Sequence, residues 1–184
     1  NAIEGTYKKF SYYAYYQYKH TKGWRPNSQL NAHTAFANLS YQVNKKLSIS
    51  VEFTHQNYVM QQPGGLTDNQ FKQNPKQSTR ERNWFSINWN IPSLKLEYRP
   101  KDNIRWNTVL FGLIGSRNAL GFLSFANRSD DLRNRDLIKD KYKNFGLESR
   151  VLYQYKLGKQ TSSLSVGLRY FTGFTNKQQG LGND

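Results

Sequence analysis

The chain has 184 residues, enough for one domain, and its 27 Lys and Arg against 12 Asp and Glu give a net charge of +15. This excess indicates an anionic partner: nucleic acid, acidic lipid or a charged small molecule. The absence of cysteine excludes disulfides and thiolate metal sites, and no run of 18 apolar residues is present to form a membrane-spanning helix.

The first third of the chain predicts long β-strands, in keeping with its 13 Tyr and 11 Phe. The first strand spans about Tyr7 to Lys19 and the second Leu30 to Val43, joined by a loop at residues 21–28 that contains Gly, Pro and Asn. After a tight turn at residues 44–46, a third strand runs from Leu47 to Tyr58. Its odd positions from 47 to 53 are apolar and its even positions are polar, so one sheet face is apolar and the other polar.

A polar excursion of about twenty residues follows, from Gln61 to Glu81, with no pattern of its own. Loops of this length inside a domain are uncommon unless they are functional. The fourth strand, Arg82 to Tyr98, has apolar residues at odd positions up to Ile91 and at even positions from Leu94. This change of parity next to Pro92 predicts a β-bulge at Pro92-Ser93.

The rest of the chain predicts three more strands. A short turn at residues 100–103 leads into the fifth strand, from Ile104 to about Arg117, which is followed by a polar segment over residues 118–144. The sixth and seventh strands, Phe145 to Leu157 and Leu164 to Thr172, flank a short turn, and a loop begins at Thr175.

Two regularities favour a membrane barrel over a soluble sheet. Short turns near Lys45, Lys101 and Lys159 alternate with longer connections, which is the layout of an outer-membrane barrel, and the strands are longer than those of most soluble proteins. The charged strand residues also fall on the parity opposite the apolar face. The predicted fold is therefore all-β, an antiparallel meander of about seven long strands. Several aromatic residues would form interfacial girdles: Tyr7, Tyr12, Tyr16, Tyr18, Tyr41, Trp89, Tyr98, Trp106, Tyr153 and Tyr155.

Several motifs resemble the barrel of TonB-dependent outer-membrane receptors, in particular the ferric-citrate receptor branch. They are Gln-Gln-Pro-Gly-Gly-Leu-Thr-Asp at 61–68, Gln-Ser-Thr-Arg-Glu-Arg-Asn-Trp-Phe at 77–85, Asn-Trp-Asn at 88–90 and Gly-Trp-Arg-Pro-Asn-Ser at 23–28. Phe-Gly-Leu at 111–113, Ser-Arg-Asn-Ala-Leu-Gly-Phe at 116–122 and Arg-Asp-Leu-Ile at 135–138 also fit. The resemblance covers nearly the whole chain.

The resemblance implies a 22-stranded barrel in the outer membrane of a Gram-negative bacterium. Such a barrel is filled by an N-terminal plug and imports a ferric citrate or siderophore-like chelate, with energy supplied through the TonB complex. Residues 1–184 would form a fragment of that barrel domain, with the plug and the remaining strands outside it. No resident cofactor is implied, because the ferric chelate is cargo, and no enzyme signature is present.

Arg25, Arg80, Arg82 and Arg117 are the candidate ligand-binding residues, since they lie in or beside the outer ends of the predicted strands. Guanidinium groups suit a carboxylate-rich chelate because they form bidentate, charge-assisted hydrogen bonds. The alternative is that they contact lipopolysaccharide, the plug or neighbouring acidic residues. Arg150 and Arg169 would face the plug or other wall residues.

Two other functions remain open at this point. A passive porin would have the same kind of strands. A soluble basic β-domain that binds nucleic acid would carry its aromatic and basic residues on one exposed face. In strands three, six and seven these residues sort onto opposite faces, so we do not expect a nucleic-acid partner.

Overall fold

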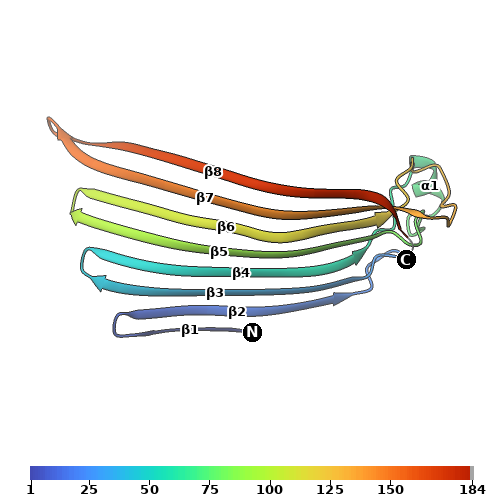
Figure 1. Cartoon of the computed structure of the whole chain (residues 1–184), viewed down its shortest axis with the longest axis horizontal. Helices are drawn as coiled ribbons and strands as arrows, with labels where there is room; N and C mark the ends of the chain where they lie inside the picture. Colours follow the sequence, from blue (N-terminus) through green and yellow to red (C-terminus); the bar gives the residue numbers. More distant parts are fainter. Residues whose placement is uncertain (183–184) are drawn as a thin grey trace.

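The computed structural model describes residues 1–182, which form one antiparallel sheet of eight strands in chain order (Figure 1). The strands are β1 Ala2–Tyr7, β2 Phe10–Thr21, β3 Leu30–Asn44, β4 Leu47–Gln61, β5 Trp84–Lys101, β6 Ile104–Gly121, β7 Arg135–Leu157 and β8 Gln160–Gly182. One short helix, α1 Asp68–Gln73, interrupts the connection between β4 and β5. The predicted all-β meander is confirmed, with eight strands in place of about seven.

The connections differ between the two ends of the sheet. At one end, hereafter the short-turn end, two-residue turns join β1 to β2, β3 to β4, β5 to β6 and β7 to β8. At the other, the loop end, lie the three longer connections of residues 22–29, 62–83 and 122–134 (Figure 1). Lys8 and Gly158 give their turns a positive φ, 54° and 63°, as tight hairpin turns require.

The strand register places most apolar side chains of the half of the sheet near the short turns on one face, hereafter the apolar face. Val51, at the centre of β4, pairs with Leu39 of β3 and Leu94 of β5, and antiparallel partners point to the same side. The same register continues through Leu110 of β6 and Leu147 of β7. These side chains are not covered by a second layer: Val51 is 50% exposed and Val166 of β8 is 62% exposed.

The opposite face, hereafter the polar face, carries the charged residues of the short-turn half of the sheet. Asn38 donates a hydrogen bond to Glu52 (2.9 Å), and Lys95 pairs with Glu97 (2.6 Å). The predicted sorting of charges is confirmed by the register for Glu52, Lys95, Glu97, Arg105, Glu148, Arg150 and Arg169. Every Asp and Glu within the described strands lies on this face: Glu4, Glu52, Glu97, Asp136, Asp140 and Glu148.

The predicted bulge at Pro92-Ser93 is wrong. Phe53 pairs with Pro92 and Glu52 with Ser93 in an unbroken β4–β5 register, so no extra residue is inserted. The change of parity has a different cause. Apolar residues lie on the apolar face near the short turns, whereas Phe85, Ile87 and Trp89 lie on the polar face beneath the loops. Trp89 therefore lies on the polar face, whereas the other nine predicted aromatics lie on the apolar face.

Three predicted boundaries are also wrong. The first predicted strand is a hairpin, because Lys8-Lys9 form a turn between β1 and β2. The predicted loops at residues 118–144 and after Thr175 are largely strand, since β7 begins at Arg135 and β8 continues to Gly182. These extensions carry polar residues on both faces, so they show no apolar alternation. In the predicted patternless excursion, Thr67 and Gln70 form a capping box that starts α1.

The sheet has almost no buried apolar interior. Ile87, 5% exposed, is the only buried hydrophobic residue among residues 1–182. No helix among these residues is long and apolar enough to span a membrane. The two outer strands, β1 and β8, each pair with one neighbour only.

Candidate functional site

The three connections at the loop end form one interlocked layer, and arginine side chains hold it together. Arg25, in the connection 22–29, donates to the carbonyl oxygens of Gly64 (2.9 Å), Pro63 (3.3 Å) and Gln77 (2.9 Å). Asn27 donates from Nδ2 to the carbonyl of Arg80 (3.0 Å). Side chains of the connection 22–29 are therefore held by the backbone carbonyls of the connection 62–83.

Arg80 joins the connection 62–83 to the connection 122–134. Its guanidinium group has five N–H groups. All five donate to carbonyl oxygens: those of Phe122, Thr79, Arg128, Ser124 and Phe125, at 2.7–3.0 Å. The residue is 4% exposed, and its guanidinium group stacks over the Phe122 ring at 5.0 Å. Each N–H group of this buried cation thus has a partner.

A second set of contacts closes the connection 122–134 against the start of β7. Arg82 donates to the carbonyls of Leu132 and Arg133, and Asp130 accepts a hydrogen bond from the backbone N–H of Glu81 (3.2 Å). Asp130 also forms an ion pair with Arg135 (2.6 Å), in which the Arg135 side chain is fully buried and that of Asp130 is 5% exposed.

These contacts predict that the connection 122–134 loosens in acid. Burial raises the pKa of Asp130, but N–H donors from Leu132 and Glu81 and the charge of Arg135 outweigh it, so the pKa lies below the ordinary value of 3.8. A carboxyl group with a depressed pKa in the folded state stabilises it above its unfolded pKa, and this contribution is lost as the pH falls through the folded pKa.

Amide hydrogen exchange, corrected for its intrinsic pH dependence, should therefore show that the protection of residues 122–134 stays constant above about pH 5. The protection of the same residues should be lower below about pH 4. Asp130→Asn should remove most of this pH dependence. An unchanged profile in that variant would show that Asp130 is not the responsible group.

Beneath the loops, the polar face carries a small apolar cluster beside a charged one. Tyr58 and Phe85 pack with ring centroids 6.0 Å apart next to Ile87. Arg117 pairs with Ile87 in the register, and its guanidinium group forms an ion pair with the fully buried Asp140.

Two more residues complete the charged cluster. Tyr142 donates its hydroxyl to Asp140 (2.9 Å), and Lys177 lies opposite Asp140 in β8. The Arg117 side chain stays 41% exposed. This cluster combines a cation that solvent can reach with a carboxylate that it cannot.

The chain is similar in fold to a transporter. A solved structure of the ferric citrate transporter FecA in the unliganded form matches 98% of this chain with a TM-score of 0.87 and 19% sequence identity. The match covers 26% of the FecA chain, so this chain spans about a quarter of that protein's length. No protein-family model and no curated protein sequence matches the chain. The likeness to FecA shows the fold of this sheet.

The four candidate arginines occupy two different places. Arg25, Arg80 and Arg82 lie in the interlocked loop layer and donate to backbone carbonyls. Arg117 lies below them on the polar face, paired with Asp140. Ligand contact by these residues stays a prediction, and Arg117 is the candidate with a substantially exposed side chain that is paired to an acid.

Sequence reasoning missed Asn27, Arg135 and Asp140. One signal could have placed Asp140 on a strand face. Lysines at positions 139, 141 and 143 alternate with other residues, and this period of two would place Asp140 on the face opposite the lysines.

Proposed function

We propose that the chain forms part of the barrel wall of an outer-membrane transporter that imports a ferric chelate. The observation that carries this proposal is the uncovered apolar face, which runs across all eight strands. Every Asp and Glu of the described strands, and most of their Lys and Arg, lie on the other side. An exposed apolar surface of this extent is untypical of a soluble monomer but is what a lipid-facing wall requires. Its fold likeness to part of FecA supports the same conclusion.

Aromatic side chains also line the short-turn side of the apolar face, where a barrel meets the headgroup region. Phe10 and Tyr41 pack 5.1 Å apart, Tyr98 pairs with Trp106, and Tyr153 stacks on Tyr155 at 5.7 Å. Tyr and Trp are favoured at membrane interfaces because their rings are amphipathic. In the proposal, the short turns face the periplasm and the loop layer faces outward.

The free edges of β1 and β8 support a larger barrel. Unpaired backbone groups in hydrocarbon cost several kcal/mol each, so both edges must pair with further strands. We propose that residues 1–184 belong to a 22-stranded barrel whose plug and TonB-contacting region lie outside this sequence. The wall alone would not transport.

The chelate class is proposed from charge and position. The net charge of +15 suits an anionic cargo, and Arg117 and Lys177 bring positive charge to the polar face just beneath the loops. A ferric citrate or siderophore-like chelate with carboxylate groups could accept hydrogen bonds there. The register places most basic strand residues on the polar face, away from the aromatic side chains of the apolar face. This separation disfavours the nucleic-acid alternative.

The test uses the full-length protein that contains this chain. We expect it in the outer-membrane fraction, and we expect the purified protein to bind ferric citrate or a ferric siderophore by isothermal titration, with weaker binding in Arg117→Gln. Recovery in the soluble fraction would overturn the membrane assignment. Membrane localisation without binding of any ferric chelate would instead favour a passive porin.

A further inference from the structure

Two neighbouring turns at the short-turn end, β3–β4 and β5–β6, form a basic pocket (Figure 1). Its volume is about 640 Å³, which lies within the range of small-molecule sites. One acid, Asp102, belongs to the lining together with five exposed cations: Lys45, Lys46, Arg99, Lys101 and Arg105. The pocket therefore concentrates positive charge in a space that a small anion can occupy.

The side chains of these five cations are available to a ligand. Within residues 1–182, none of them forms a hydrogen bond or an ion pair. Glu97 is near Arg99, but its carboxylate is already paired with Lys95 (2.6 Å). The arginines at the loop end differ, because Arg80 donates to backbone carbonyls and Arg117 pairs with Asp140.

Hydrogen bonds hold the two turns in place beneath these side chains. The backbone N–H of Arg99 donates to the carbonyl of Lys46 (2.7 Å), which joins the end of β5 to the β3–β4 turn. Asn44 accepts the backbone N–H of Lys46 through Oδ1 (2.8 Å), and Gln42 donates to the carbonyl of Leu47 (3.1 Å). The cations therefore project from backbone that is fixed before a ligand arrives, and a fixed site loses less entropy on binding.

The register places the pocket on the polar face. Tyr98 pairs with Trp106 on the apolar face, so Arg99 and Arg105, one step along each strand, point to the other side. In the proposed barrel the polar face lines the lumen, and the short turns face the periplasm. The pocket would thus open at the periplasmic mouth, away from lipid.

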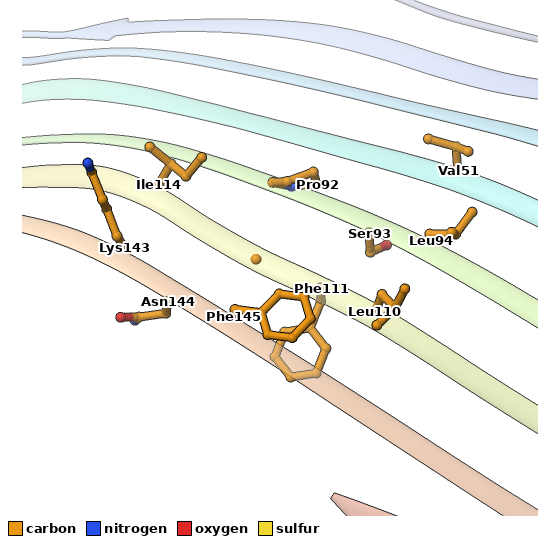
Figure 2. Close-up of a pocket in the computed structure, with 11 residues that line it drawn as sticks. Val51, Pro92, Ser93, Leu94, Leu110, Phe111, Ile114, Lys143, Asn144 and Phe145 are labelled. Carbon is orange, nitrogen blue, oxygen red and sulfur yellow. The ribbon is translucent and has the colours of Figure 1, made fainter. Parts of the chain in front are cut away.

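The other large hollow of the sheet has a different character. It has a volume of about 660 Å³ and lies on the apolar face, where Val51, Leu94 and Leu110 line it beside Lys143 (Figure 2). A single cation among apolar side chains gives this hollow little selectivity for an anion. The pocket at the short-turn end is the one whose charge fits a polyanionic ligand.

We infer that this pocket binds a polycarboxylate anion at the periplasmic mouth of the barrel. Arg99 and Arg105 can form bidentate, charge-assisted hydrogen bonds with carboxylate groups, and the three lysines supply further donors. The inference rests on the proposed function, because the chelate is the anion that would travel along the lumen to this end. The pocket is then a second binding site for the cargo, at the opposite end of the sheet from Arg117 and Lys177. Ferric citrate and metal-free citrate share the required chemistry.

The test measures binding of both anions to the detergent-purified full-length protein by isothermal titration. All proteins carry Arg117→Gln, so that the site beneath the loops contributes less. An exposed ion pair changes an equilibrium constant by a factor of about 1.4 to 5, so the loss of three should weaken binding about tenfold. We expect this loss in Lys46→Gln/Arg99→Gln/Arg105→Gln. The matched control, Lys139→Gln/Lys141→Gln/Lys143→Gln, removes the same charge from the apolar face of β7 and should bind as its parent does.

A variant with the opposite expected sign guards against misfolding. Asp102→Asn removes the acid from the pocket lining and should strengthen binding of both anions about twofold to fivefold. A protein that had lost its fold could not bind more tightly. Weaker or unchanged binding in Asp102→Asn would contradict the inference.

Three further results would overturn the inference: unchanged binding in the pocket triple, an equal loss in the control triple, or inorganic phosphate bound as tightly as citrate. Each can occur in a protein that fractionates with outer membranes and binds ferric citrate through Arg117. Recovery of the protein in the soluble fraction, with citrate still bound through the pocket, would instead overturn the proposed function and leave the anion site in place.

Discussion

Arg80→Ala should release the loop layer while leaving the sheet intact. The substitution removes the five hydrogen bonds that the buried guanidinium group donates, and it leaves the carbonyls of Phe122, Ser124 and Arg128 without this donor. The carbonyl of Phe125 keeps the backbone N–H of Arg128 (3.0 Å). Each buried acceptor left unsatisfied costs about 1–3 kcal/mol. We expect the free energy of local opening at residues 62–83 and 122–134 to fall by at least about 3 kcal/mol, allowing for water that enters.

Amide hydrogen exchange resolves this effect by segment. Protection should fall in both connections and stay unchanged at the centres of β4, β5 and β6. Arg80→Lys should be intermediate, because an ammonium group has three donors and no planar fork. Arg128→Ala is the matched control, since this side chain is exposed in the same connection, and it should change stability by no more than about 0.5 kcal/mol. Equal effects of Arg80→Ala and Arg128→Ala would refute the proposed role of Arg80.

The apolar face gives the second large prediction. Val51 lies midway along the apolar stretch of β4, between Ile49 and Phe53 on the same face. Val51→Arg should destabilise the protein folded in lipid vesicles by about 2–4 kcal/mol. The reason is that an arginine near the bilayer midplane must be desolvated or must distort the membrane. The measurement is a reversible denaturant titration of the full-length protein in vesicles.

Two variants on the same strand serve as controls. Thr54→Arg places the same side chain on the polar face, where Phe36 and Ile91 are its register partners, and should cost much less. His55→Arg lies on the apolar face beyond the apolar stretch, at a depth where the cost is about 0–1 kcal/mol. If Val51→Arg costs no more than Thr54→Arg, the apolar face does not contact lipid.

The sequence by itself determined the two-faced sheet near the short turns. In residues 47–53, strict alternation assigns every side chain to a face, because a strand repeats every two residues. The Asn- and Gly-containing turns likewise predicted the ends of β3, β5 and β7 to within three residues. These features are local, so no partner strand is needed to predict them.

Only the tertiary structure decided the loop end. Phe85, Ile87 and Trp89 alternate as cleanly as residues 47–53, but their register with β4 places them on the opposite face, under the loops. Residues 136–144 pair with β6 although both faces of this segment carry mainly polar residues, since backbone hydrogen bonds need no apolar pattern. Four of the five partners of Arg80 are backbone carbonyls of a connection more than forty residues away. The positions of carbonyl groups depend on how the loops fold rather than on which side chains they carry.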